Sequence, residues 1–294
     1  MKHSHLLLFV VLLLCTLCAA LPVCAEEVQS EGFIWPFHDY NEDPLMSYDS
    51  IERRQDVLTE GDWNYLVSDG EATVFRYFGS ETSWKIPETL GGVPVTTIGG
   101  SVFPPCTKKA FVTIPASVKY INAEAFYCCQ TLEDISLPAG VIFIGDYAFN
   151  GCDALSSFVI PEGVEEIGSN PFANCDRLKH LYISPENPRF AVADGVLFDK
   201  TGKRLITYLC ANTADSYEIP QGIREIGEWA FCNCSALTSV TVPDSVTVIG
   251  KNAFYACPWI VLTVGRDSYA KQYCIENGIK YVYPDPLDWL LDQE

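Results

Sequence analysis

Basic residues are scarce in this sequence of 294 residues, which has 19 lysines and arginines against 38 aspartates and glutamates. The apolar N-terminal segment described below has one basic residue, Lys2, and no acidic one. Without this segment, 18 basic residues stand against 38 acidic ones, a formal charge of −20. Such a surface repels nucleic-acid phosphates and anionic lipid head groups. The acidity favours solubility, and no D-x-D-x-D-G calcium loop accompanies it. We therefore expect no nucleic-acid partner, no metal and no cofactor.

Histidine is also scarce, with four residues, two of them in the N-terminal segment. A Ser-His-Asp or Cys-His site would have to use His38 or His180 as its base. His180 lies in the repeats described below, at an offset held elsewhere by aspartate or serine. This favours a solvated strand residue over a catalytic base.

Long apolar runs are absent after residue 25. The run from Leu6 to Leu14 follows Lys2 and is typical of a secretory signal peptide, because a spanning helix needs about 20 apolar residues. The small residues of Val23-Cys24-Ala25 predict cleavage near Ala25. A lipoprotein is the alternative, although Val23 stands where a lipobox has a smaller residue. We expect a secreted or cell-surface-associated protein without a membrane span or C-terminal anchor.

Units of 23 residues recur, each opening on Ile, Leu or Val before proline, at Ile114, Leu137, Ile160, Ile219 and Val242. An opening unit from Ile86 fits the frame after a five-residue insertion. The apolar offsets in the first full unit are Ile114, Val118, Ile121, Phe126, Leu132 and Ile135. A unit this short cannot enclose these side chains, whereas stacked units bury each on its counterpart at a strand spacing of about 4.8 Å. The sequence predicts a mainly β repeat solenoid, with short strands ending at the prolines and short helical turns.

The other segments extend or close this array. The period lapses between Ile183 and Ile219, where Lys200-Thr201-Gly202 predicts a hairpin within an enlarged repeat. Asp69-Gly70 predicts a capping hairpin, and Ser268 to Glu276 a short helix ending at Asn277-Gly278. We divide the chain into a signal peptide (1–25), an acidic leader whose composition favours disorder (26–58), an N-terminal capping hairpin (59–85), repeats (86–264, with the enlarged repeat at 183–218) and a C-terminal cap and tail (265–294).

The pattern I/L-P-x-x-V-x-x-I-G-x-x-A-F-x-x-C-x-x-L-x-x-V resembles the BspA-type leucine-rich repeats of bacterial surface and secreted proteins, over residues 86–264. The resemblance implies a leucine-rich-repeat solenoid and, for some members, adhesion or binding to host proteins. Because a fold does not fix an activity, it implies no particular ligand. The chain departs from the pattern at Lys109, which replaces leucine, and at Ser169–Pro171, where proline replaces the alanine before phenylalanine. These departures leave the local geometry open.

Six of the ten cysteines after Ala25 share one repeat offset: Cys106, Cys129, Cys152, Cys175, Cys234 and Cys257. Small buried apolar residues are expected at such an offset, so we predict buried thiols. Disulfides between neighbouring units are the first alternative, and zinc is a weaker one because a line of thiols is not a tetrahedron. The cysteines outside this offset are better candidates for a bridge: Cys128, Cys210, Cys232 and Cys274.

Carboxylates are numerous enough to form a glycosidase-type pair, so a secreted polysaccharide hydrolase is one alternative function. Glu165 and Glu166, however, lie at offsets occupied elsewhere by Lys119-Tyr120 and Thr247-Val248. Such variation is typical of surface residues. With no motif that implies a mechanism, we expect a protein that is not an enzyme.

Two offsets of each unit lie between core positions and are predicted to face outward, from Thr96-Thr97 to Thr247-Val248. We predict that the middle of this stripe binds the ligand, through Lys119, Tyr120, Ile142, Phe143, Glu165 and Glu166. A second outward stripe runs through Phe111–Thr113, Asp134–Ser136, Ser157–Val159, His180–Tyr182 and Ser239–Thr241. The leading hypothesis is a monomeric secreted adhesion protein that binds a protein or glycan, including host extracellular molecules. A spacer module without a ligand is the other alternative.

Overall fold

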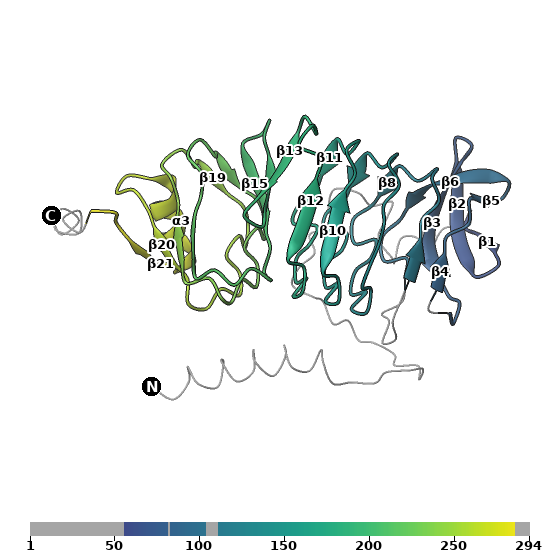
Figure 1. Ribbon diagram of the computed structural model, residues 1–294, viewed down its shortest axis with the longest axis horizontal. Coiled ribbons are helices and arrows are strands. Elements are labelled where there is room, and N and C mark those ends of the chain that lie inside the picture. The colour runs from purple at the N-terminus through teal and green to yellow at the C-terminus, as the bar shows by residue number, and fades with distance from the viewer. Residues whose placement is uncertain (1–55, 82, 104–110, 286–294) are drawn as a thin grey trace. The chain divides into compact units, whose positions relative to one another are not determined.

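The computed structural model describes residues 56–81, 83–103 and 111–285, shown in Figure 1. The predicted signal peptide, nearly all of the acidic leader, Cys106, Lys109 and the end of the C-terminal tail lie outside these residues. The described elements are β1 (Leu58–Glu60), β2 (Trp63–Ser68), β3 (Glu71–Tyr77), β4 (Ser83–Lys85), β5 (Thr89–Leu90), β6 (Val93–Ile98), β7 (Phe111–Thr113), β8 (Tyr120–Ile121), β9 (Phe143–Ile144), β10 (Ser157–Ile160), β11 (Glu166–Ile167), β12 (His180–Ile183), β13 (Phe190–Ala193), β14 (Val196–Asp199), β15 (Arg204–Tyr208), β16 (Ser216–Glu218), β17 (Glu225–Ile226), β18 (Ser239–Thr241), β19 (Val248–Ile249), β20 (Val261–Thr263), α3 (Tyr269–Asn277) and β21 (Lys280–Val282).

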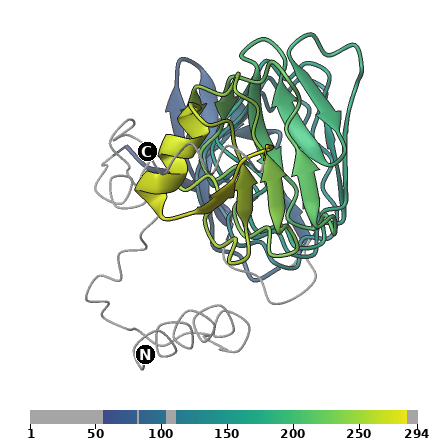
Figure 2. The same cartoon turned by 90° about the vertical axis from the view of Figure 1, so that its left-hand side faces the viewer.

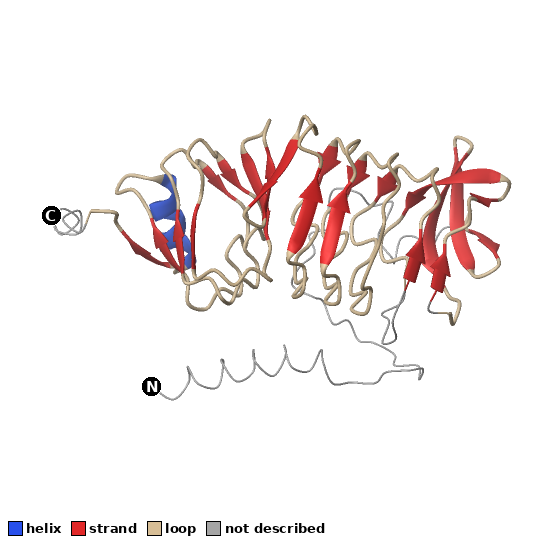
Figure 3. Ribbon diagram, viewed as in Figure 1, coloured by secondary structure: helices blue, strands red, loops and turns tan. Residues whose placement is uncertain are grey.

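Short parallel strands from successive repeats stack in register. Within one sheet, Ile121 of β8 pairs with Ile144 of β9, and Ile144 pairs with Ile167 of β11, so each partner is 23 residues further along the chain. A second set of strands, including β10 and β12, forms the other side of the turns, except at residues 133–138, where no strand forms. Figure 3 shows the strands on both sides, joined by loops. The predicted fold class, a mainly β repeat solenoid, is confirmed.

Stacked aromatic rings fill the core between the two sets of strands. The rings of Phe126 and Phe149 lie 5.2 Å apart with an interplanar angle of 4°, and Phe172 follows at 5.7 Å. After the enlarged repeat the stack resumes, with Phe231 5.2 Å from Tyr208 and 4.9 Å from Phe254. The 23-residue spacing therefore places one ring of each turn on the ring of the next.

The turns are tight because two residues of each full repeat adopt left-handed backbone conformations: Glu124 and Cys128, Tyr147 and Gly151, Asn170 and Asn174, Trp229 and Asn233, Asn252 and Ala256. In the unit that departs from the pattern, Asn170 has φ 25°, against 54° at the equivalent Tyr147. The left-handed turn is therefore retained in this unit, although Ser169–Pro171 departs from the repeat pattern. Glycine is required at Gly145, where a Cβ atom would overlap the backbone nitrogen of Ala123 in the preceding turn.

The caps follow the predicted turn signals. β2 and β3 form an antiparallel hairpin around Asp69-Gly70. At the other end, the Ser268 hydroxyl accepts a hydrogen bond from the Lys271 N–H at the start of α3, and Gly278 ends the helix with φ 65°. Figure 2, viewed from the C-terminal end of the solenoid, shows this helix in yellow beside the last strands. The predicted N-terminal hairpin and C-terminal helix are both confirmed.

The enlarged repeat inserts a three-stranded meander, β13–β14–β15, into the stack. Two of its strands, β14 and β15, are buried on both faces: Leu197 and Ile206 pack into the core of the preceding repeats, while Val196 and Leu205 pack into the core of the following ones. The hairpin predicted around Lys200-Thr201-Gly202 joins β14 to β15. β15 then pairs in parallel with β17, so the insertion re-enters the repeat frame.

The aromatic stack contains one buried hydroxyl, on Tyr208, which has no hydrogen-bond partner among the described residues. Burial raises the pKa of Tyr208 to about 12. Phenylalanine occupies this offset in the neighbouring units, so we expect Tyr208→Phe to raise the free energy of unfolding by about 1 kcal/mol, since an unsatisfied polar group is removed without loss of packing. Urea denaturation would measure the change, and a lower stability would show that the hydroxyl is bonded in solution.

Candidate functional site

The six residues predicted to bind a ligand lie on three neighbouring strands or directly before them. Tyr120 of β8 pairs with Phe143 of β9, and Phe143 pairs with Glu166 of β11. These side chains form one row across the sheet at about the 4.8 Å strand spacing. We call Lys119, Tyr120, Ile142, Phe143, Glu165 and Glu166 the central row. The structure thus brings the predicted residues together.

The central row is more exposed at its polar positions than at its apolar ones. Lys119, Glu165 and Glu166 are exposed, Tyr120 is 37% exposed, and Ile142 and Phe143 are half-buried. The outward prediction was wrong for Thr96, which is buried and donates a hydrogen bond to Glu71 at 3.0 Å. Glu71 also pairs with Lys119 at 3.1 Å, so the capping strand β3 lies beside this end of the row while both side chains stay exposed to solvent.

At its other end the backbone ladder stops at β11, and arginine side chains satisfy its carbonyls. In regular turns the carbonyl of Ile142 accepts from Glu165 N–H and that of Ile144 from Gly168 N–H. At β11 the equivalent carbonyls belong to Glu165 and Ile167. Glu165 O accepts from Arg189 Nη1 at 2.8 Å, and Ile167 O accepts from Arg204 Nη2 at 3.0 Å. Both arginines come from the enlarged repeat.

Two buried asparagines continue these side-chain bridges. Asn187 Nδ2 donates to the carbonyls of Glu162 and Val164, at 2.8 and 3.2 Å. Asn170 Nδ2 donates to Trp229 O at 2.6 Å, and its Oδ1 accepts from the Thr207 hydroxyl at 2.9 Å. Amide and guanidinium groups therefore replace the missing strand-to-strand hydrogen bonds, as buried backbone groups require.

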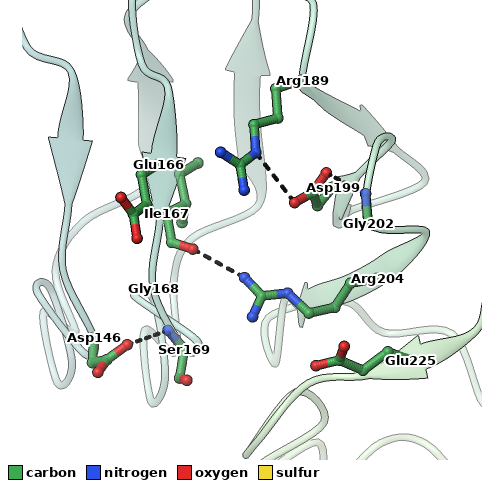
Figure 4. Close-up of a pocket in the computed structure, with 10 residues that line it drawn as sticks. All are labelled: Asp146, Glu166, Ile167, Gly168, Ser169, Arg189, Asp199, Gly202, Arg204 and Glu225. Carbon is green, nitrogen blue, oxygen red and sulfur yellow. Dashed lines mark hydrogen bonds and ion pairs between the residues drawn. The ribbon is translucent and has the colours of Figure 1, made fainter. Parts of the chain in front are cut away.

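A cleft of about 380 Å³ opens where the ladder is interrupted. Figure 4 shows Arg204 reaching across it to Ile167, with the Glu225 carboxylate beneath and Glu166 on the opposite wall. Its lining residues are Asp146, Glu166, Ile167, Gly168, Ser169, Arg189, Asp199, Gly202, Arg204 and Glu225. Because Glu166 belongs to both, the cleft continues the central row.

The carboxylates of the cleft differ in how many hydrogen bonds the protein's own groups donate to them. Burial opposes ionisation of Asp199, but hydrogen bonds from the Gly202 N–H, Thr201 and Arg189 outweigh it and hold its pKa below the usual value. Asp146 accepts from the Ser169 N–H. Among the described residues, neither the Glu166 nor the Glu225 carboxylate has a hydrogen-bond partner. These two carboxylates are available for an external group.

The second outward stripe lies on the other set of strands. Val159 of β10 and Tyr182 of β12 pair in register and are 61% and 54% exposed. His180 is exposed and its ring stacks on Tyr182 at 6.1 Å. The prediction of a solvated strand residue at His180 is confirmed.

Five of the six cysteines of the repeat offset belong to the described residues, and they lie in the core. Cys129, Cys152, Cys175, Cys234 and Cys257 are all buried. The Cys175 and Cys257 thiols donate to the carbonyls of Phe149 and Phe231, at 3.1 and 3.0 Å. Burial raises the pKa of Cys175 and Cys234 well above the usual range and that of Cys257 to about 11. A protonated buried thiol is a poor nucleophile.

We therefore expect the free thiols of Cys175, Cys234 and Cys257 to be unreactive in the native protein and to react fully in denaturant. Thiol counting with an aromatic disulfide reagent, with and without guanidinium chloride, would measure this. The Cys257→Ser variant is the control, and should lower the count in denaturant by one. Pairing or zinc binding by these cysteines would instead lower the count of the unmodified chain in denaturant.

Within residues 56–81, 83–103 and 111–285, no cluster of three or more histidine, cysteine or acidic side chains can hold a metal ion. No helix in this part of the chain is long and apolar enough to cross a membrane.

The cleft was not predicted from the sequence. Glu225 occupies the same repeat offset as Glu166, one of the two offsets predicted to face outward. Arg189 and Arg204 have no counterpart in the regular units, because they lie in the enlarged repeat, where the 23-residue period lapses. The sequence does contain one indication of a site here, which is the interruption of the 23-residue period. An interrupted strand ladder leaves backbone carbonyls that other donors must satisfy.

Comparisons with known proteins agree with the repeat pattern. The family model described as "BspA type Leucine rich repeat region" matches residues 71–191 and 207–278 in six copies. No curated protein matches the chain. The solved structures that resemble it include the pneumococcal vaccine antigen PcpA, at 22% identity over 71% of this chain and 69% of that one, with a TM-score of 0.47. A leucine-rich cell surface protein of Faecalibacterium prausnitzii is 26% identical over 71% and 76%, with a TM-score of 0.42. A leucine-rich repeat protein of Eubacterium ventriosum is 17% identical over 70% of both chains, with a TM-score of 0.49.

Proposed function

Because the chain belongs to the BspA-type leucine-rich repeat family, whose fold alone fixes no activity, we propose from the surface that its repeats present that it is a secreted or cell-surface binding and adhesion protein. Its signal peptide directs it out of the cell, and its solenoid presents an extended face to a protein or glycan ligand. The protein is monomeric and does not catalyse a reaction.

The observation that carries this proposal is the register of the central row. Tyr120, Phe143 and Glu166 lie side by side on successive strands, so the face they form is continuous. The aromatic and aliphatic side chains of this row have polar residues on both sides, Lys119 at one end and Glu166 at the other. An apolar patch with a polar rim is typical of an interaction site.

We expect the double variant Tyr120→Ala, Phe143→Ala to lose ligand binding at least tenfold, while its free energy of unfolding falls by about 1 kcal/mol or less. Binding would be measured by surface plasmon resonance against a panel of purified extracellular-matrix proteins and mucins. Thermal melts followed by circular dichroism would measure stability in parallel.

The matched control is Val159→Ala, Tyr182→Ala, which removes an exposed, in-register pair from the other set of strands. It should retain the affinity of the unmodified protein. Equal affinity of the unmodified protein and the central-row variant would remove this row as the site. A chain that binds no member of the panel would favour the spacer hypothesis.

A further inference from the structure

The cleft at the interrupted ladder offers both hydrogen-bond donors and acceptors to a ligand. Within the described residues, Arg204 makes one hydrogen bond, to Ile167 O, out of five N–H groups in its guanidinium. Its remaining donors face the cleft between the Glu166 and Glu225 carboxylates (Figure 4). Two acceptor groups and one donor group thus converge on one open space, as they do in ligand sites.

The charges of the lining argue against a strongly charged ligand. After Arg189 is paired with Asp199, the cleft retains Arg204 with the carboxylates of Asp146, Glu166 and Glu225, an excess of negative charge, and of these three only Asp146 accepts a hydrogen bond within the described residues. An anion would face three carboxylates, and a simple cation would face the guanidinium of Arg204. A neutral ligand with groups that both donate and accept hydrogen bonds satisfies Arg204, Glu166 and Glu225.

An added peptide strand does not fit this edge. Such a strand would pair with the free carbonyls of β11, but Arg189 already occupies Glu165 O and Arg204 occupies Ile167 O. Peptides also bring apolar side chains that need apolar pockets, whereas Ile167 is the one large apolar side chain in the lining. The cleft is therefore suited to hydroxyl groups.

We propose that this cleft binds a neutral saccharide unit of a glycan, through its hydroxyl groups. Hydroxyls donate to the Glu166 and Glu225 carboxylates and accept from Arg204, and a volume of about 380 Å³ lies at the lower end of the range of small-molecule sites. This inference rests on the proposed function, because it assigns a ligand class to one end of the same face.

The test is binding of the chain from residue 26 to 294 to an array of neutral, sulfated or sialylated, and amino-containing oligosaccharides, followed by calorimetric titration with the best neutral one. We expect neutral saccharides to bind and Glu166→Gln, Glu225→Gln to weaken them at least tenfold, because charged acceptors become neutral amides. Glu218→Gln, an exposed carboxylate on β16, is the control and should bind unchanged. Glu225→Gln alone replaces the double variant if the latter melts at a lower temperature.

Binding of charged saccharides only, binding of a peptide that the cleft variant abolishes, or no saccharide binding would each overturn the inference. Its failure is separable from that of the proposed function. If saccharides do not bind while Tyr120→Ala, Phe143→Ala still abolishes binding to an extracellular protein, the cleft inference is wrong and the proposed function stands. If saccharide binding is lost in the cleft variant and retained in the central-row variant, the cleft is the site and the row is not.

Discussion

Replacing Phe149 by alanine is expected to lower the free energy of unfolding by about 3–5 kcal/mol. The ring is fully buried between Phe126 and Phe172, and Phe158 packs on it edge-on at 4.8 Å. Backbone hydrogen bonds between turns hold these neighbours in place, for example from Phe126 N–H to Ala148 O, so the resulting cavity cannot collapse. Guanidinium chloride titration monitored by circular dichroism would measure the loss.

Tyr120→Ala is the matched control, because it also truncates an aromatic ring on a neighbouring turn but at a partly exposed position. Its effect should be about 0.5 kcal/mol. A similar small loss for Phe149→Ala would contradict the assignment of this ring to the core stack.

Deleting one whole repeat, 137–159, is expected to leave a cooperatively folded protein, whereas deleting 11 residues inside it, 144–154, should abolish cooperative unfolding. The whole deletion joins Ser136 to Ile160, so every offset of the following turn falls on its counterpart in the preceding one. Each turn contacts mainly its neighbours, so the stack shortens without losing its pattern. The partial deletion removes the core residues Ile144, Phe149 and Cys152 together. The half turn that is left cannot align its offsets with their counterparts in the neighbouring turns.

Thermal melts followed by circular dichroism distinguish the two products. The 23-residue deletion should melt in a single sharp transition at a somewhat lower temperature, and the 11-residue deletion in a broad one or none. Equally cooperative melting of both chains would show that the 23-residue frame is wrong.

Periodicity was sufficient to predict the solenoid because each unit repeats the same buried positions. Phe126, Phe149 and Phe172 could be placed in one stack from their spacing alone, and the structure has them there. Turn chemistry was equally informative: Asp69-Gly70 and Asn277-Gly278 marked the cap hairpin and the end of the C-terminal helix, since only certain residues tolerate a left-handed backbone.

The cleft could not be predicted because its geometry depends on contacts between residues that the period does not relate. Arg204 reaches Ile167, 37 residues earlier in the chain, and no sequence rule gives that pairing. Thr96 shows the same limit on a smaller scale. Its offset faces outward in later units, but β3 of the cap lies beside it and buries it. The central row was predictable as a row, while the degree of exposure of Ile142 and Phe143 was not.

Strands β14 and β15 of the meander are buried on both faces, so the meander closes one block of turns while it opens the next. Gene duplication or loss of whole 23-residue units can therefore lengthen or shorten either block without moving the cleft, as long as the two turns before the meander and the one after it are kept, because these turns and the meander line the cleft. In a lineage of such proteins, the number of turns on each side of the meander can vary independently while the meander stays unchanged. The meander with its cleft and the number of turns on each side of it would then evolve as separate traits.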